Sequence, residues 1–127
     1  EILDYIGLIG QKDELVENLT IVGQKKVEIA KALATNPSLL MLDEVASGLN
    51  PVEQDDMVHL IRKLHDELDI TMIIVEHIMR FVMTIAHRII VLDNGAIIKV
   101  GDAKSVSKDE KVIKAYLGEE YIGPSRN

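Results

Sequence analysis

The chain is 127 residues long and 47% hydrophobic, enough for a folded core, so disorder is not expected over most of its length. It has no cysteine, which excludes disulfides and thiolate-rich zinc sites, and it has no apolar run long enough to cross a membrane. A net charge of −7, with one Phe, three Tyr and no Trp, provides neither the basic patch nor the stacking platform of a nucleic-acid binder, so we predict no nucleic-acid partner.

The first part of the chain predicts a short helix followed by a longer one. In the opening "EILDYIGLIG", apolar residues recur at helical spacing, and Gly10 is expected to close the helix. Residues 11–19 are polar and are predicted to be irregular or briefly helical. Residues 24–35, "QKKVEIAKALAT", have the pattern of an amphipathic helix, and Asn36–Pro37 is expected to stop it.

The middle of the chain predicts a strand, a helix and a second strand. Leu39–Leu42 is a short unbroken apolar run, typical of a strand covered on both faces. Asn50 is suited to cap a helix that begins with Pro51 and runs to about Leu68. Ile70–Val75 is a second run of the doubly buried kind. Because a crossover helix joins the two runs, we expect the strands to be parallel.

The rest of the chain predicts a short helix, a hairpin and a final helix. The short helix falls near Ile78–Ile85. In "RIIVLDNGAIIKV", Asn94–Gly95 separates two β-branched runs and indicates a tight hairpin turn. A last helix is expected around Asp109–Leu117, followed by a polar tail over 118–127.

Two pairs of chemically capable residues follow the two predicted parallel strands. Asp43 and Glu44 come after the first strand, and Glu76 and His77 after the second. Ligands of parallel α/β sheets gather at the carboxyl ends of the strands, so we expect both pairs at one edge. Asp43 is suited to hold Mg²⁺ directly or through its waters. Glu44 is placed to orient or deprotonate a reacting water, and His77 to donate to a developing phosphate charge or to orient the same water.

A possible anion site lies at the start of the first long helix. Gly23–Gln24 would offer backbone N–H groups and the positive end of the helix dipole. Each feature alone has an ordinary explanation as a solvated turn, a helix cap or a connection. His59, His65 and His87 lack metal-ligand spacing and are interpreted as structural or exposed. The order of the features along the chain favours a nucleotide-phosphate site.

That order resembles the second half of an ATP-binding-cassette (ABC) ATPase domain. "LLMLDE" (Leu39–Glu44) resembles the Walker B strand with its catalytic glutamate, and "ASGLNP" (Ala46–Pro51) resembles the D-loop. "IIVEH" (Ile73–His77) resembles the switch-histidine strand, and "VGQKKVEIAKALATNP" (Val22–Pro37) resembles the signature motif and its helix. The stretches "SGLNP", "EHIMRFVM", "VLDNGAIIKVG" and "VIKAYLGEEY" look closest to ATPase subunits of branched-chain amino-acid importers, and the ATPases of lipopolysaccharide exporters are similar at the same places.

The chain departs from the family pattern in several places. Ile21 falls where the signature serine is expected, so either Thr20 substitutes after a one-residue shift or this contact is weak. Val45 stands where proline is common, and Asn50 replaces the frequent aspartate of the D-loop. None of the eight glycines is followed by lysine, so the phosphate-binding loop, called Walker A, is absent.

The resemblance implies a partial P-loop NTPase fold. This is an α/β core of parallel strands with crossover helices plus a C-terminal hairpin, lacking the Walker A half. Residues 1–37 would be the end of a helical subdomain with the signature motif and its helix. Residues 38–117 would be a portion of the RecA-like core, with Walker B, D-loop, switch histidine, hairpin and last helix, and residues 118–127 a tail. Since the first residue is Glu1, we expect the chain to begin inside a longer or processed protein.

The resemblance also implies how the chain would act. In complete family members two ATPase domains enclose two ATP molecules with Mg²⁺, and each site joins one subunit's phosphate loop to the other's signature. The predicted site residues are Glu44 and His77 for catalysis, Asp43 for the metal, Ser47, Gly48 and Asn50 in the D-loop, and Thr20, Val22, Gly23 and Gln24 in the signature, facing the partner's ATP.

The expected partners are a second ATPase subunit, transmembrane permease subunits and, indirectly, a solute-binding protein, with the protein peripheral on the cytoplasmic face of the cell membrane. The isolated chain should bind ATP poorly. It should also self-associate, because the missing phosphate-loop strand would leave an edge of Ile70–Val75 open.

The alternative functions are a non-catalytic half-domain acting as an interaction module and the ATPase of another ABC system, such as a lipopolysaccharide exporter. An ATPase that works on DNA is less favoured, because no coiled-coil heptads are present.

Overall fold

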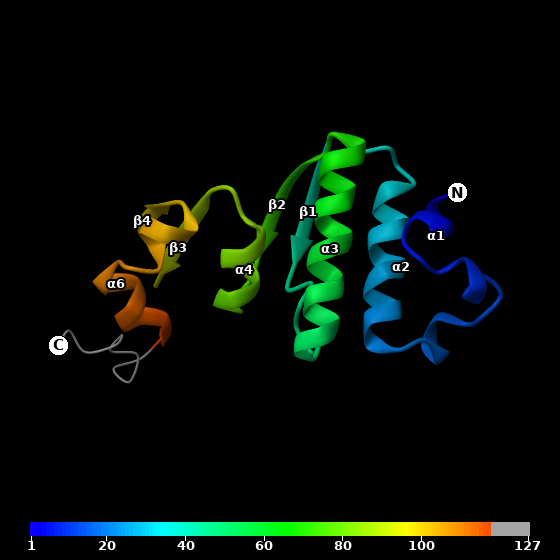
Figure 1. Cartoon of the computed structure of the whole chain (residues 1–127), viewed down its shortest axis with the longest axis horizontal. Helices are drawn as coiled ribbons and strands as arrows, with labels where there is room; N and C mark the ends of the chain where they lie inside the picture. Colours follow the sequence, from blue (N-terminus) through cyan, green and yellow to red (C-terminus); the bar gives the residue numbers. More distant parts are fainter. Residues whose placement is uncertain (118–127) are drawn as a thin grey trace. The chain divides into compact units, whose positions relative to one another are not determined.

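The computed structural model describes residues 1–117, which form helices, a parallel strand pair and a hairpin (Figure 1). The chain divides into two compact units, Glu1–Phe81 and a second that starts at Val82. No helix within the described residues is both long enough and apolar enough to cross a membrane.

The first unit begins with a very short helix and two single turns. Helix α1 spans Ile2–Tyr5, and 3₁₀ turns follow at Ile9–Gln11 and Val16–Asn18. The prediction that Gly10 closes the first helix is wrong, because the helix ends at Tyr5 and Gly7 turns the chain with a φ of +77°. Glycine adopts this left-handed conformation without steric cost, so Gly7 ends the helix earlier.

Helix α2 spans Ile21–Leu33 and starts three residues before the predicted residue 24. Its N-cap is Thr20, whose hydroxyl accepts a hydrogen bond from the Gly23 N–H at 3.2 Å. The cap satisfies one of the N–H groups that a helix start leaves without an internal partner, and so fixes the earlier start. Ile29, Ala30 and Leu33 form its buried side.

The predicted strand–helix–strand unit is confirmed. Strand β1 (Leu39–Asp43) pairs in parallel with β2 (Thr71–Val75), and helix α3 (Pro51–Leu68) connects them. The side chain of Asn50 accepts from the N–H groups of Val52 and Glu53, both at 3.0 Å, and Glu53 accepts from the Asn50 N–H at 2.9 Å. This reciprocal pair is a capping box, and it fixes where α3 begins.

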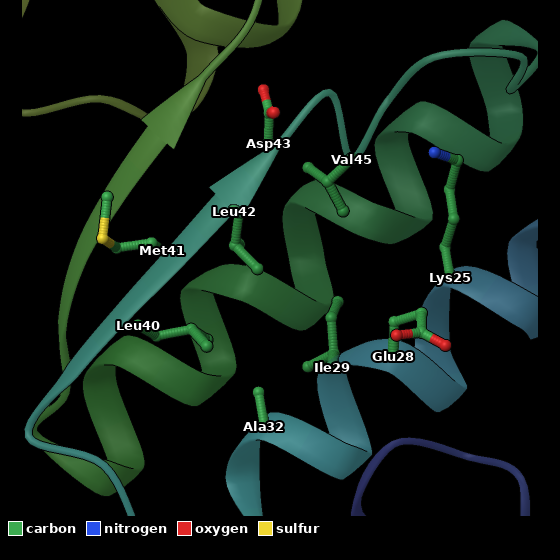
Figure 2. A pocket seen from close by; sticks show the side chains of 9 residues that line it. All are labelled: Lys25, Glu28, Ile29, Ala32, Leu40, Met41, Leu42, Asp43 and Val45. Atoms are coloured by element: carbon green, nitrogen blue, oxygen red, sulfur yellow. The ribbon is translucent and has the colours of Figure 1, made fainter.

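The two strands are covered on only one face, so the prediction of double burial is wrong. Leu40 and Leu42 are buried and point toward α2 and α3, whereas Met41 points the other way (Figure 2). The opposite face exposes four large apolar side chains, those of Leu39, Met41, Ile73 and Val75, by 46% to 68%. The reason is that both long helices of this unit pack against the side that carries Leu40 and Leu42.

Helix α1 is attached to α3 through Tyr5. The Tyr5 hydroxyl donates to a carboxylate oxygen of Glu67 at 2.5 Å, and the Lys63 ammonium lies 4.1 Å from the centre of the ring. Burial, followed by the hydrogen bond and charge of Glu67, raises the pKa of Tyr5 to about 12. The phenol therefore keeps its proton, and its hydrogen bond to Glu67, to a more alkaline pH than an ordinary tyrosine does.

A short helix, α4 (Met79–Ile85), follows β2 as predicted, and the second unit is built on the predicted hairpin. Strand β3 (Ile89–Asp93) pairs antiparallel with β4 (Ala96–Gly101). Asn94 and Gly95 both have positive φ, 47° and 80°, as the tight turn requires.

Helical segments complete the second unit. Helix α5 (Ala103–Val106) was not predicted, and its N-cap is Asp102. The expected last helix is present as α6 (Glu110–Val112), which continues into a π-helical turn, Ile113–Leu117. The Lys99 ammonium of β4 lies 3.1 Å from the Asp109 carboxylate at the start of α6. The predicted tail, 118–127, lies outside the described residues.

Candidate functional site

The parallel pairing brings both predicted groups of residues to one edge of the sheet. Asp43 is the register partner of Val75, so the two strands end side by side. The Glu44 N–H donates to the Val75 carbonyl at 2.9 Å, which continues the pairing one step past the strands. The residues that follow each strand therefore emerge together, as the sequence predicted.

Glu44 and His77 face each other at this edge. The distance from Glu44 Oε1 to His77 Nδ1 is 3.5 Å, and the two side chains are 59% and 61% exposed. A contact of this length in water is weak, since charges this exposed are well screened. A water within hydrogen-bonding reach of both side chains would meet a carboxylate and an imidazole, the two kinds of group used in general acid–base chemistry.

The turn that carries Glu44 is held by contacts from two other elements. The Glu44 carbonyl accepts from the Lys25 ammonium of α2 at 2.9 Å and from the Ser47 N–H at 3.1 Å. The Ala46 N–H donates to Glu76 Oε1 at 2.6 Å. Glu44 itself has a φ of +48°, in the left-handed region that side chains rarely adopt.

Asp43 ends β1 with its carboxylate exposed, pointing outward from the strand end (Figure 2). Over residues 1–117 no three His, Asp or Glu side chains converge on one point, so this part of the chain offers no all-protein metal cage. Mg²⁺ commonly keeps several waters and takes one or two carboxylates plus substrate phosphates. The single exposed carboxylate of Asp43 fits that mode of binding.

The predicted signature residues occupy the first turn of α2. The Thr20 hydroxyl caps the helix, and the Gln24 amide donates to the Leu19 carbonyl at 3.0 Å, so both side chains contact their own backbone. Val22 is half-buried and Gly23 is buried. The first turn of α2 is distant in sequence from Glu44 and His77. Lys25 of the same helix nevertheless donates a hydrogen bond to the Glu44 carbonyl.

The predicted D-loop residues lie between Glu44 and α3. Gly48 has a φ of +77°, and Ile21 Cγ2 lies 3.8 Å from where a side-chain carbon at Gly48 would stand. The signature turn and the D-loop are thus neighbours within this unit. The Asn50 side chain is engaged in the capping box, and Ser47 contributes its N–H to the Glu44 carbonyl.

A hollow of about 340 Å³ lies between α2 and β1 (Figure 2). Its walls are mainly aliphatic, and Lys25, Glu28 and Asp43 are its only charged side chains. Neither Glu44 nor His77 lines it, so the hollow does not contain this pair. The residues that line it are Lys25, Glu28, Ile29, Ala32, Leu40, Met41, Leu42, Asp43 and Val45.

Sequence reasoning did not predict the contacts that Glu76 and Lys25 make with the turn that carries Glu44. Glu76 was placed at the sheet edge because it precedes His77, but its bond to the Ala46 N–H has no local sequence signal. Lys25 lies within the predicted amphipathic helix, whose pattern does not indicate that its ammonium reaches the Glu44 carbonyl. Both contacts join residues 19 or more positions apart.

Comparisons with curated proteins and with solved structures found relatives of this chain. No protein-family model matches the chain. The high-affinity branched-chain amino acid transport ATP-binding protein BraF of Pseudomonas aeruginosa is 46% identical over 96 residues, covering 76% of this chain and 38% of BraF. The corresponding LivG protein of Escherichia coli is 38% identical over 117 residues, covering 92% of this chain and 46% of LivG.

The solved structures include a cassette of the same arrangement. The crystal structure of the ADP conformation of MJ1267, an ATP-binding cassette of an ABC transporter, superposes with a TM-score of 0.84 at 33% sequence identity. The match covers 93% of this chain and 48% of MJ1267. The chain thus spans about half the length, or less, of the relatives it matches.

Proposed function

Because the chain belongs to the ATP-binding cassettes of ABC transporters, we propose that it supplies the Walker B, switch-histidine and signature half of an ATP-hydrolysing subunit. We further propose that the subunit serves an importer of branched-chain amino acids. The observation that supports hydrolysis best is the parallel pairing, which places Glu44 and His77 3.5 Å apart at the carboxyl edge of the sheet. Support for the solute class comes from the similarity to BraF and LivG, which are branched-chain amino acid transport ATP-binding proteins.

The chemistry follows from the types of side chain at this edge. Glu44 would accept a proton from, or orient, the water that attacks the γ-phosphorus, and His77 would donate to charge developing on the phosphate. Asp43 would hold Mg²⁺, directly or through its waters, and that ion supplies neutralisation of phosphate charge when bound. The turn that carries Glu44 would keep the carboxylate on the side of His77.

The partners proposed are those of a transporter complex. The signature residues Thr20, Val22, Gly23 and Gln24 would face the ATP bound by a second ATPase subunit, with the D-loop between the two sites. Permease subunits and, indirectly, a solute-binding protein would complete the importer, with this subunit peripheral on the cytoplasmic face of the membrane.

The test is Glu44→Gln in a complete cassette that contains this chain. The amide keeps the shape of the side chain but accepts a proton poorly, so steady ATP hydrolysis should fall by about a hundredfold or more, while Mg²⁺-ATP binding changes little. Glu14→Gln, an isosteric change at an exposed residue of the first unit, is the matched control and should leave both unchanged. Equal turnover in Glu44→Gln would remove Glu44 from the reaction.

The 127-residue chain alone should bind ATP poorly, because its sequence has no Gly-Lys-Ser/Thr loop to cradle the phosphates. Calorimetric titration of Mg²⁺-ATP into this chain, beside a complete cassette, measures the difference directly. Binding of equal affinity by both would contradict the proposed division of the site.

A further inference from the structure

The backbone of Glu44 is held in a conformation that its side chain disfavours. Its φ of +48° lies in the left-handed region, where a Cβ crowds the following carbonyl oxygen. Such residues persist where the surrounding structure over-determines them, and they are common at functional sites. Asparagine or glycine would adopt this conformation more easily, so a glutamate here requires external contacts.

Glu76 supplies one of those contacts. Its Oε1 accepts the Ala46 N–H at 2.6 Å, across 30 positions of sequence. Its other oxygen is buried and, within the described residues, has no hydrogen-bond partner. Burying a carboxylate oxygen without a hydrogen-bond partner is unfavourable. The hydrogen bond between Oε1 and the turn holds the Glu76 side chain in place in spite of this cost.

Lys25, a residue of helix α2, supplies the second contact. Its ammonium donates to the carbonyl of Glu44 itself at 2.9 Å. The turn is therefore fixed by a side chain that follows β2 and by a side chain of α2, in addition to its own Ser47 N–H bond. A charged donor makes a stronger hydrogen bond to a carbonyl than a neutral donor does.

We propose that Glu76 and Lys25 are positioning residues that hold the strained Glu44 turn and thereby set the Glu44 carboxylate opposite His77. The 3.5 Å contact with His77 is too long and too exposed to fix Glu44 by itself. The location of the carboxylate is consequently set by its backbone, which Glu76 and Lys25 control. The catalytic part of this inference rests on the proposed hydrolysis, whereas the structural part does not.

The structural part is tested by hydrogen exchange of the Ala46 amide in this chain, measured by NMR. In Glu76→Ala the amide loses its acceptor, and its exchange should accelerate by about tenfold or more relative to the amides of β1 and β2. Glu76→Gln retains Oε1 and should exchange near the wild-type rate. The inference is wrong if Glu76→Ala leaves Ala46 unchanged, if β1 and β2 accelerate equally, or if Glu76→Gln behaves like Glu76→Ala.

The catalytic part is tested in a complete cassette. We expect Glu76→Ala and Lys25→Met to lower kcat by about tenfold or more with little change in KM, because a misplaced Glu44 affects the reaction more than the binding of ATP. Glu76→Gln should recover most of the rate. Unchanged kcat in both variants, or a loss confined to KM, would overturn the positioning role. If the wild-type cassette itself does not hydrolyse ATP, the proposed function fails, and the exchange result still decides the structural part.

Discussion

The capping box of α3 allows a quantitative prediction from one residue. Asn50→Ala removes an acceptor that receives two N–H groups, those of Val52 and Glu53, each at 3.0 Å. A hydrogen bond of this kind contributes a net ~0.5–1.5 kcal/mol, and loss of an N-cap typically costs about 1 kcal/mol and up to about 2. We therefore expect the free energy of unfolding to fall by about 1–2 kcal/mol.

The measurement is urea unfolding of this chain followed by far-ultraviolet circular dichroism. With a slope of roughly 2 kcal/mol/M for a small protein, the loss lowers the midpoint by about 0.5–1 M. Asn50→Asp supplies the same acceptor and adds a negative charge at the helix start, so it should unfold close to the wild-type midpoint.

An exposed residue of the same helix serves as the control. Asp56→Ala lies on α3 and should change the free energy of unfolding by no more than about 0.5 kcal/mol. The reasoning is refuted if Asn50→Ala unfolds at the wild-type midpoint. It is also refuted if Asn50→Asp loses as much stability as Asn50→Ala, because both aspartate and asparagine accept the two N–H groups.

Two further predictions concern pH and self-association. The hydrogen bond from Lys99 holds the pKa of Asp109 below its ordinary value of 3.8, so this carboxylate stabilises the fold above that pH, and its contribution is lost as pH falls through 3.8 and below. Asp109→Asn should flatten the dependence of the urea midpoint on pH in this acidic range, and an unchanged slope would contradict the assignment. Met41 and Ile73 are 68% and 46% exposed on the uncovered face of the β1–β2 sheet, so Met41→Lys should reduce self-association in sedimentation velocity, whereas equal association of variant and wild type would exclude this face.

The elements that the sequence predicted well are those specified by neighbouring residues. Helix α3 begins at the predicted residue because Asn50 and Pro51 form a local start signal. The hairpin follows from Asn94–Gly95, which accepts positive φ at both turn positions. Helix α1 was overestimated because its apolar spacing continues past Gly7, where the backbone turns.

Burial was predicted less well because it depends on what packs against an element. The unbroken run Leu39–Leu42 has the composition of a strand covered twice, yet only Leu40 and Leu42 are buried. Nothing in the run itself distinguishes one face from the other. A strand covered on both faces needs a second packing layer, whereas the two long helices of the first unit both pack on the side that carries Leu40 and Leu42.

The candidate site also has features that the sequence predicts and features that it does not. The meeting of Glu44 with His77 follows from the order of the strands and their parallel direction, which a βαβ pattern predicts. The contacts of Lys25 and Glu76 with the turn have no periodic signal, because each joins one side chain to a distant backbone group. The positive φ of Glu44 was also not predictable, since glutamate rarely adopts that conformation and a tertiary contact is needed to hold it.

The exposure of the Glu44–His77 pair has a consequence for how such a site can act. At the 3.5 Å that separates the two side chains, even two opposite unit charges attract each other by only about 1 kcal/mol at the dielectric constant of water. Electrostatic stabilisation of a phosphate transition state is strongest when the groups are removed from water. In a site that excludes water, the same charges interact several times more strongly. With both side chains about 60% exposed in this chain alone, that exclusion must come from a surface that covers the carboxyl edge of the sheet when ATP is bound. In the proposed assembly, the Walker A half of the cassette and a second ATPase subunit would supply it together. If the second subunit is needed for this exclusion, hydrolysis should depend on subunit concentration more steeply than nucleotide binding does.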